Sequence, residues 1–499
     1  MIRASRITRR RTLGCVGTFC GRGRARRNNV RGVADAAAAA SQNMTPIEKI
    51  VRDSIKATGP MSISTYMQLC LSHPTHGYYM NPANPIFGKK GDFITSPEIS
   101  QVFGELIAIW HLHRWIAAGR PKRIRIVELG PGRGTLMSDA LRAFSQNVLA
   151  REALKSTGTV HLVETSRPLR KLQEETLRSF GALKRFEMDG EKEKEFVQWH
   201  DSLEDVNEAE QENPVDGDTF TMVVAHEFFD ALPVHVLERG TNGWHEIQIT
   251  SVPDPAAPTI LTPSNSFSPH ALPPLRLIRN PEISTLSSFL GSISPRYSDL
   301  PVGSRVEVSP TSFKLARQVA ELVNNPKSAG GSALIIDYGW GGISGNSLRA
   351  FKNHQIVDIF ERPGECDLTA NVDFELLREA ISDAAETHGP IAQRWFLKEM
   401  GIMIRLAMLE MAKAAAKRQA KTEGKKTSQE YESYNPNTEA VHRLLDRNGM
   451  GEQYKVFGIT GTGGREMTSD EASERGCYPF CNEEFWEEDE EVEERLCKD

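Results

Sequence analysis

The segment that most constrains the fold is Arg125–Thr135, RIVELGPGRGT, in which an apolar run ends in three alternating glycines. Ile126, Val127 and Leu129 are typical of a buried parallel strand, and the glycines follow where the chain must turn tightly. Apolar residues then recur at helical spacing over residues 136–144, so the loop is expected to open a helix whose amide groups point back into the turn. This order predicts a doubly wound α/β sheet with a cofactor loop.

The spacing of the glycines distinguishes two kinds of cofactor loop. A dinucleotide fingerprint requires a glycine or alanine at position 135, where this chain has Thr135, which disfavours a nucleotide-binding dehydrogenase. The pattern is instead E-x-G-x-G-x-G, which resembles the first motif of S-adenosylmethionine-dependent methyltransferases. The residues predicted to bind S-adenosyl-L-methionine here are Glu128, Gly130, Pro131, Gly132, Gly134 and Thr135.

The next strand supplies a second part of the predicted cofactor site. In VHLVETS, residues 160–166, Glu164 lies where a doubly wound nucleoside site needs an acid to bind the ribose hydroxyls. The third strand is weaker and is expected at either residues 184–187 or residues 196–199. Trp199 and Asp201 follow the second alternative, where the adenine is usually held in this fold. A glycine turn or a strand-ending acid alone is common without a ligand, but together they favour cofactor binding.

The first 42 residues differ in kind from the rest. They contain ten arginines, no lysine and one acid, Asp35, together with Ser and Thr and without a long apolar stretch, which is typical of a mitochondrial transit peptide expected to be disordered. The alternative is a basic arm that binds nucleic acid, but Phe19 is the only aromatic residue among the arginines.

The remaining chain is acidic. The first 42 residues hold ten of the 60 basic residues and one of the 66 acidic residues. The rest of the chain therefore has 50 basic and 65 acidic residues, which gives a net charge of −15. Nine acids lie in EEFWEEDEEVEE, residues 483–494, so residues 461–499 are predicted to form a solvated, disordered acidic tail. Such a body is not typical of a nucleic-acid binder.

Membrane and metal signals are weak in this sequence. No apolar run approaches the roughly 20 residues that a membrane helix requires, so the chain is not expected to be an integral membrane protein. The seven cysteines lack ligand spacing, and Cys477 and Cys481 have no second pair or nearby histidine to complete a zinc site. We predict free thiols in a reducing compartment and no metal.

Six motifs, in order, resemble those of the MidA-like mitochondrial protein arginine methyltransferases that act in assembly of respiratory complex I. The motifs are HPTHGYY (73–79), GDFITSPEISQVFGEL (91–106), VELGPGRGT (127–135), HEFFDALPV (226–234), IDYGW (336–340) and DLTANVDF (367–374). The resemblance runs from about Thr45 to Ile459. It implies a class I methyltransferase fold in the mitochondrial matrix, with S-adenosyl-L-methionine as methyl donor. It further implies symmetric dimethylation of an arginine on a core quinone-side subunit of complex I (NADH:ubiquinone oxidoreductase).

The motifs also predict a division of the chain. Residues 43–121 are expected to form an N-terminal helical extension and lid, and residues 122–400 a Rossmann-like methyltransferase core. A Pro- and Ser-rich surface insertion is expected within that core at residues 251–301, and C-terminal helices and a strand at residues 401–460. A non-catalytic assembly chaperone that keeps the methyltransferase fold is the alternative function.

A fourth strand is predicted from the apolar residues at 220–225, and two acids just past it, Glu227 and Asp230, are the predicted acceptor site. A guanidinium is charged and delocalised, hence a poor nucleophile, and paired carboxylates can localise its charge. We expect Glu227 to clamp it and Asp230 to orient it or, alternatively, only to cap the loop. His226 is expected to contact the cofactor or to accept a proton, unless it is a structural histidine.

The resemblance further implies a lid over the substrate channel, for which helix capping and packing is the alternative. The lid residues are Tyr78, Tyr79, Asp92, Thr95, Ser96 and Glu98.

Overall fold

The computed structural model describes residues 44–84, 86, 94–179, 196–212, 217–251, 275–423, 438–464 and 477–481. All of these except Met44 belong to one unit of the chain. The predicted transit peptide, Asp92 and most of the acidic tail lie outside the described residues, as do residues 184–187.

The central layer is an eight-stranded sheet in the order β15-β16-β10-β5-β2-β3-β4, with β14 paired to β10. Its strands are β2 (Arg123–Leu129), β3 (Thr159–Val163), β4 (Val197–His200), β5 (Thr219–His226), β10 (Gly331–Trp340), β14 (Val372–Asp373), β15 (Glu386–Ala392) and β16 (Tyr454–Gly461). The five strands from β4 to β10 are parallel, whereas β16 is antiparallel to both of its neighbours. The third parallel strand is thus the second of the two predicted alternatives.

The strand order reverses between β2 and β5. From β2 the chain moves outward through β3 to β4, and then returns to β5 on the other side of β2. Glu128 and Leu129 pair with Val224 and Ala225, so the loops after β2 and β5 leave the same edge side by side. Ligands of doubly wound sheets bind at such a switch point, and the predicted fold is confirmed in this respect.

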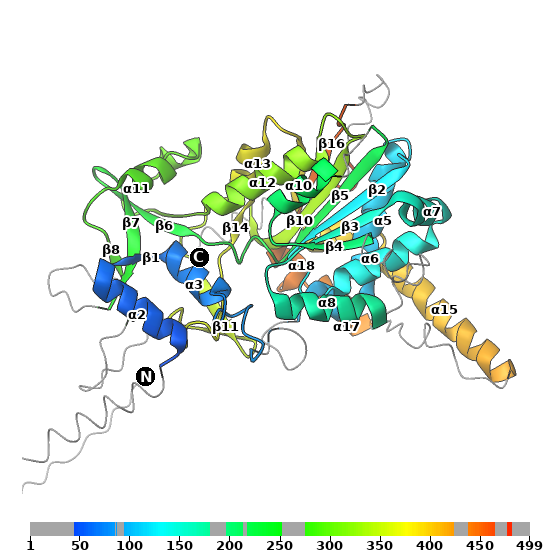
Figure 1. Ribbon diagram of the computed structural model, residues 1–499, viewed down its shortest axis with the longest axis horizontal. Coiled ribbons are helices and arrows are strands. Elements are labelled where there is room, and N and C mark those ends of the chain that lie inside the picture. The colour runs from blue at the N-terminus through cyan, green and yellow to red at the C-terminus, as the bar shows by residue number, and fades with distance from the viewer. Residues whose placement is uncertain are drawn as a thin grey trace, which may run out of the picture. The chain divides into compact units, whose positions relative to one another are not determined.

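Helices cover both faces of this sheet (Figure 1). Alternate strand residues divide between the faces: Ile126 and Met222 pack with Met137 of α6, whereas Val127 and Val223 belong to a second apolar cluster. The first face is covered by α5 (Gln101–Ala117), α6 (Thr135–Gln146) and α7 (Val148–Thr157), and the second by α10 (Leu203–Glu212), α12 (Pro310–Val323) and α13 (Phe374–Ile381). The remaining helices around the sheet are α4 (Ser96–Ile99), α8 (Arg167–Ser179), α14 (Gln393–Glu399), α15 (Ile402–Glu423), α17 (Thr438–Leu444) and α18 (Met450–Gln453).

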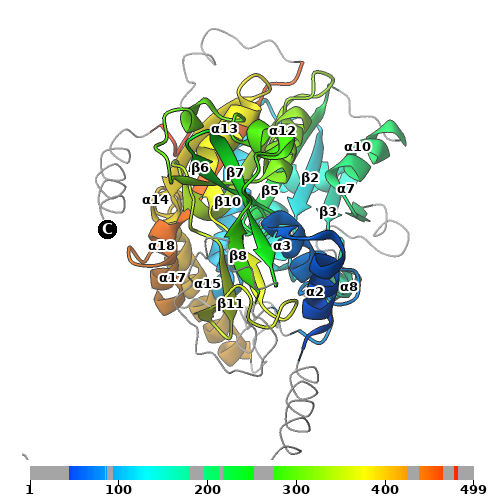
Figure 2. The same ribbon diagram turned by 90° about the vertical axis from the view of Figure 1, so that its left-hand side faces the viewer.

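A smaller antiparallel layer is built from segments far apart in the sequence (Figure 2). Its strands are β1 (Met61–Ser62), β6 (His235–Gly240), β7 (Gly243–Thr250), β8 (Arg276–Arg279) and β9 (Arg305–Val308), and α2 (Pro46–Thr58) and α3 (Ile63–Ser72) pack in the same apolar cluster. A separate three-stranded sheet contains β11 (Arg349–Lys352), β12 (Gln355–Val357) and β13 (Asp367–Thr369). The alternating residues at 234–238 and 244–249, on either side of the turn at residues 240–243, predict a β-hairpin, and β6 and β7 form it.

The N-terminal region is not purely helical. Helix α2 begins at the Thr45 cap, whose hydroxyl accepts from the amide of Glu48 at 3.0 Å, and it ends before Gly59. Between α2 and α3, however, Met61 and Ser62 pair with β7. Two residues are too few to show an alternating pattern, so this strand has no sequence signal.

Residues 275–301 do not form the surface insertion that the sequence predicts, because they contain secondary structure and buried side chains. Strand β8 pairs with β7, and α11 (Thr285–Leu290) and a 3₁₀ turn, η2 (Pro295–Tyr297), follow it. Leu290 and Tyr297 are fully buried beside Trp244. Ser284 and Ser294 cap these two short helices, so a composition that suggests a loop encodes short elements instead. Residues 252–274 lie outside the described part.

No helix within the described ranges has both the length and the apolar character needed to cross a membrane.

Candidate active site

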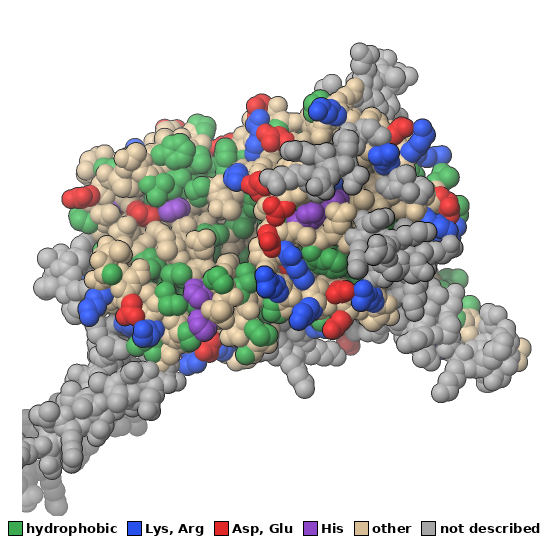
Figure 3. Space-filling view, viewed as in Figure 1, with side chains coloured by type: hydrophobic (Ala, Val, Ile, Leu, Met, Phe, Trp, Pro, Cys, Tyr) green, Lys and Arg blue, Asp and Glu red, His purple; other side chains and the backbone are tan. Residues whose placement is uncertain are grey.

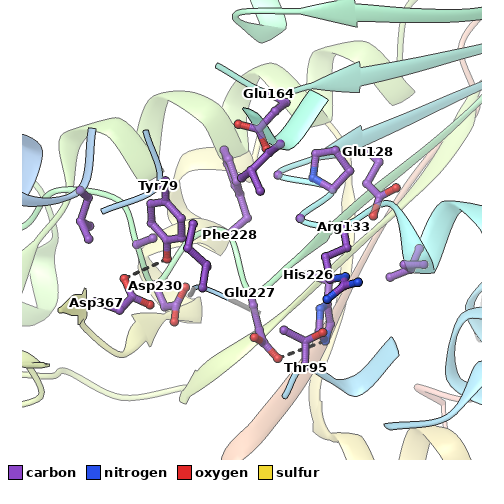
Figure 4. Close-up of a pocket in the computed structure, with 18 of the residues that line it drawn as sticks. Tyr79, Thr95, Glu128, Arg133, Glu164, His226, Glu227, Phe228, Asp230 and Asp367 are labelled. Carbon is purple, nitrogen blue, oxygen red and sulfur yellow. Dashed lines mark hydrogen bonds and ion pairs between the residues drawn. The ribbon is translucent and has the colours of Figure 1, made fainter. Parts of the chain in front are cut away.

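A cavity lies where the loops after β2 and β5 leave the central sheet, with an empty volume of about 1250 Å³, part of it open solvent (Figure 4). The predicted residues that line it are Tyr79, Thr95, Glu98, Glu128, Gly130, Pro131, Gly132, Thr135, Glu164, His226, Glu227 and Asp230. Of the predicted residues that the structure describes, five do not line it: Tyr78, Ser96, Gly134, Trp199 and Asp201. Each of the six motifs contributes at least one residue to the lining, the last two through Tyr338 and Asp367.

The glycine loop requires glycine at its first and last positions. Gly130, Gly132 and Gly134 all have positive φ, at 62°, 51° and 79°. A Cβ on Gly130 would lie 2.6 Å from Cδ2 of Phe228, and Gly134 caps α6 without a side-chain hydrogen bond to its first amides. The loop therefore exposes backbone rather than side chains to a ligand.

Glu128 turns a buried carboxyl group toward the cavity. Its Oε2 has no hydrogen-bond partner among the described residues, and burial raises its pKa to about 8. A buried acceptor without a partner costs free energy, which a ligand that donates a hydrogen bond would offset. The cationic amino group of S-adenosyl-L-methionine has that chemistry, so the loop and Glu128 fit the amino acid end of this cofactor.

Glu164 lies at the end of β3, as predicted, and is held in place from two sides. Its Oε1 accepts from the amide of Ser166 at 2.7 Å, and its Oε2 accepts from Nε2 of Gln173 at 3.3 Å. Burial raises its pKa to about 7. Each carboxylate oxygen can accept further bonds, so Glu164 fits the hydroxyl groups of a ribose.

Trp199 and Asp201 do not line the cavity but are linked through other side chains to the glycine loop and to Glu164, respectively. The indole of Trp199 donates to Oε1 of Gln173 at 2.9 Å, and Nε2 of Gln173 donates to the carbonyl of Gly132 at 2.9 Å. Asp201 is exposed and pairs with Arg170, whose Nε donates to the carbonyl of Glu164. The sequence predicts that Trp199 and Asp201 lie where the adenine is held, but the contacts of both side chains are with protein groups.

Glu227 combines burial with an unusual backbone. It has a positive φ of 49°, which is rare for a residue with a side chain and typical of sites where the fold imposes a geometry. Burial raises the pKa of its carboxyl group to about 8. Its Oε1 accepts a hydrogen bond of 2.6 Å from the hydroxyl of Tyr454, which lies 227 residues later on β16. Tyr454 thus fixes the orientation of the Glu227 carboxyl group.

Asp337, a buried residue in the second half of β10, holds the turn that follows β5. Its Oδ2 accepts from the amides of Phe228, Phe229 and Asp230 at 3.1, 2.8 and 3.3 Å. The side chain is fully buried, and burial raises its pKa well above the usual range. Asp337 therefore caps this turn, a role that the sequence suggested for Asp230.

Asp230 and Asp367 complete a buried acidic wall. Burial raises the pKa of Asp230 to about 6, which the guanidinium of Arg349 opposes, and burial also raises the pKa of Asp367. The hydroxyl of Tyr79 donates to Oδ1 of Asp367 at 2.9 Å. We call Glu227, Asp230, Asp337 and Asp367 the acidic wall. Within the described residues none of its members forms an ion pair with a lysine or arginine, because the nearby Arg349 bonds to Ser347 and Asn371.

His226 is a neutral side chain at this edge. Its Nε2 lies 3.7 Å from Oε1 of Glu227, but burial lowers its pKa to about 3, so the two do not form an ion pair at neutral pH. The ring packs against Phe103 and Tyr454, with centroids 5.0 and 6.1 Å away. A group with so low a pKa is a weak base, which favours the structural alternative over proton transfer.

The predicted lid residues divide into two sets. Oε1 of Glu98 lies 3.4 Å from Nε of Arg133, which connects the N-terminal segment to the glycine loop. Tyr78 is fully buried, and buried Ser96 donates to Oε1 of Gln393, so these two pack behind the cavity. Thr95 lines the cavity with Glu98.

The sequence did not single out several important residues. Asp337 and Asp367 stand in motifs of the resemblance and follow strands that end at the edge of the site, so the rule that placed Glu227 could also have found them. Tyr454 lies in a C-terminal strand with no motif, and only the tertiary structure brings it to Glu227.

Comparisons with known proteins agree with this geometry. Residues 106–391 match a sequence family described as "Putative S-adenosyl-L-methionine-dependent methyltransferase". A crystal structure from Burkholderia thailandensis, described as a "likely methyl transferase" bound to S-adenosyl-homocysteine, superposes with a TM-score of 0.61 at 25% identity. The match covers 88% of this chain and 96% of that one. Fold and site together define an S-adenosyl-L-methionine-dependent methyltransferase.

Curated relatives show which family within this class the chain belongs to. The Danio rerio "Protein arginine methyltransferase NDUFAF7, mitochondrial" is 38% identical over 423 residues, covering 83% of this chain and 87% of the relative. The Homo sapiens protein of the same description is 34% identical, covering 74% and 76%, and a Drosophila melanogaster homolog is 36% identical, covering 75% and 79%. The chain belongs to this family of mitochondrial protein arginine methyltransferases, which confirms the resemblance carried by the six motifs.

Proposed function

We propose that this protein transfers a methyl group from S-adenosyl-L-methionine to a guanidinium nitrogen of an arginine in a protein substrate. The observation that carries the proposal is that three carboxyl groups of the acidic wall, those of Glu227, Asp230 and Asp367, line the cavity beside the cofactor loop without a lysine or arginine ion-pair partner among the described residues. A guanidinium is a permanent cation with several donors, so it can satisfy these carboxylates without competing for the proton.

Each residue then has a distinct task. When bound, the cofactor supplies an activated methyl group on its sulfonium sulfur. The glycine loop, Glu128 and Glu164 hold that cofactor, and Glu227 accepts hydrogen bonds from the guanidinium and leaves one nitrogen directed at the methyl group. Tyr454 keeps the Glu227 carboxylate oriented, and the turn held by Asp337 positions Asp230. Methylation of a guanidinium releases one proton, and Glu227, with its raised pKa, accepts it more readily than an exposed carboxylate would.

We base the proposed substrate and compartment on the resemblance carried by the motifs. We propose that the protein acts in the mitochondrial matrix and symmetrically dimethylates an arginine on a core quinone-side subunit of complex I, to which the motif resemblance points. Curated relatives that carry "mitochondrial" in their names support the compartment. A purely structural assembly role would not require Glu128 and Glu227 to be buried and directed into one cavity.

The proposal is tested by mass spectrometry of complex I subunits from cells with and without the protein. We expect one dimethylated arginine to lose its modification in cells that lack the protein. Re-expression of the wild type should restore it, whereas Glu227→Gln should not. Lys327→Gln, at an exposed position away from the cavity, is the matched control and should restore it. An arginine methylation pattern that is the same in all of these cells would contradict the proposal.

A further inference from the structure

Helix α15 is apolar on two sides. Ile402, Leu406 and Leu409 are buried in the apolar cluster that also contains Trp110 and Phe480. Four other apolar residues of the same helix point into solvent, with exposed fractions of 49, 70, 55 and 73%, and we call them the outer face: Met403, Ile404, Met408 and Met411. A helix that is apolar all round normally has both sides covered, so the outer face requires an occupant.

Basic residues continue the outer face toward the end of α15. Arg418 follows Met411 by seven residues and therefore lies on the same side of the helix, and Lys417 is adjacent to it. Both side chains are exposed. The surface along α15 thus passes from apolar to positively charged, which suits an occupant with apolar and acidic residues close together.

The C-terminal segment of the same chain begins at the base of this helix. The hydroxyl of Tyr478 donates to the carbonyl of Glu399 at 2.6 Å, three residues before α15 starts. Cys477 and Phe480 are buried in the cluster that holds Ile402 and Leu406. The last described residue of this stretch, Cys481, therefore lies near the N-terminal end of α15, from which the outer face begins at Met403.

The residues that follow have the matching chemistry. Residues 482–499 include nine acids between Glu483 and Glu494, with Phe485 and Trp486 among them. Eighteen residues can extend over at most about 60 Å, whereas the 22 residues of α15 span about 33 Å. The segment is thus long enough to follow the whole helix, and its short tether gives it an effective concentration of about millimolar.

We propose that residues 482–499 dock on the outer face of α15, with Phe485 and Trp486 against its methionines and the glutamates beside Lys417 and Arg418. This docking site is independent of the proposed catalytic function. An anionic membrane is a poorer occupant, because the acids anchored at the base of α15 would face lipid headgroups of the same charge. A second copy of the chain would have to displace a segment that is already tethered in place.

Amide hydrogen exchange of the full chain, compared with a chain that ends at Cys481, tests the proposal. We expect amides of residues 402–418 to exchange on the order of tenfold faster in the shortened chain, the change that about 1.4 kcal/mol of docking would give. Salt at about 1 M should reduce the difference, since exposed charge pairs are screened.

Charge reversal adds a specific control. Lys417→Glu with Arg418→Glu in the full chain should reproduce the faster exchange. Adding Glu487→Lys, Glu488→Lys, Glu490→Lys and Glu491→Lys to that variant should restore protection, while Lys327→Glu should leave it unchanged. Equal exchange in the full and shortened chains would overturn the proposal. Protection that arises only with anionic vesicles, or only as protein concentration rises, would also overturn it and would assign the outer face to a membrane or to a second copy.

Discussion

At the scale of single residues, the ionisation of Glu227 governs the proposed chemistry. Burial raises its pKa to about 8, so in the free enzyme the carboxylate form that binds a guanidinium is favoured only as pH rises. We therefore predict that kcat/KM for a protein substrate increases through about pH 8, because this ratio reports ionisations of the free enzyme. Steady-state methylation measured at a series of pH values checks this, and a profile that is flat across that region would contradict it.

The hydroxyl of Tyr454 should shift the same profile. Its hydrogen bond lowers the pKa of Glu227 relative to burial alone, so Tyr454→Phe should move the rise in kcat/KM to higher pH. The rate near neutral pH should fall roughly tenfold or more, since a hydrogen bond to a charged group is worth about 1.5–3 kcal/mol. Tyr66→Phe, which removes a hydroxyl bonded to the carbonyl of Ile359, is the control. An unshifted profile in Tyr454→Phe would exclude Tyr454 as the group that orients Glu227.

The role of a single residue could be predicted from the sequence only where neighbouring residues in the chain indicate it. Glu227 and Glu164 could be located because each follows an apolar strand whose carboxyl end faces the switch point. The contacts of Trp199 and the role of Asp337 as a turn cap required the tertiary structure. Trp199 contacts Gln173, and Asp337 contacts the turn after β5. Both partners belong to other elements, so the spacing of residues along the chain does not reveal these contacts.

At the scale of elements, the loop between β2 and α6 depends on close backbone approach. Gly130→Ala would place a Cβ 2.6 Å from Phe228 and impose a positive φ on alanine, so we predict loss of S-adenosylhomocysteine binding. Gly119→Ala is the matched control, because Gly119 also has positive φ but nothing within 4 Å of the added Cβ.

Calorimetric titration with S-adenosylhomocysteine and a thermal melt separate the two effects. Both variants should lose stability, by about 1–3 kcal/mol from backbone strain, but only Gly130→Ala should lose binding. Wild-type affinity in Gly130→Ala would show that the loop does not need this approach.

The elements that the sequence predicted well are those with long apolar patterns. Strands β2, β5 and β10 are buried along most of their length because helices cover both faces of the sheet, and each contains a short apolar run. The second sheet was only partly foreseen, as the β6–β7 hairpin. Its other strands have two to four residues, and β1 and β8 depend on β7 for their pairing, which local patterns do not indicate.

At the scale of the whole molecule, the buried carboxyl groups couple ligand binding to stability. Burial raises the pKa of Glu128 and Glu227 from about 4.5 to about 8, so between these values the folded state binds more protons than the unfolded state. Their stabilising protonation is complete below about pH 4.5 and is lost as pH rises through about 8, so the free energy of unfolding falls over that interval. We predict a lower melting temperature for the unliganded protein at pH 8 than at pH 5, by denaturation in matched buffers.

Glu128→Gln provides the control for that prediction. It removes one raised pKa without changing the size of the side chain, so the dependence of stability on pH should become shallower. If the stability of the variant depended on pH as steeply as that of the wild type, Glu128 would not contribute to this pH dependence.

Fold class and family could be read from the whole sequence because six motifs with strand and loop context occur in one order. The same reading could not place the antiparallel layer, since it is assembled from residues 61–62, 235–250, 276–279 and 305–308, separated by other elements. Long-range assembly of short strands leaves little trace in composition, and the Pro- and Ser-rich stretch from residue 275 shows this clearly.

The most direct test of the central claim uses the purified protein, a complex I substrate and a donor with a labelled methyl group. The labelled product is hydrolysed to amino acids, and the affinity for S-adenosylhomocysteine is measured in parallel. We predict label in methylated arginine with the wild type, and with Glu227→Gln a loss of labelling at unchanged cofactor affinity. Label in another amino acid, or wild-type labelling by Glu227→Gln, would contradict the assignment of the acidic wall as an arginine site.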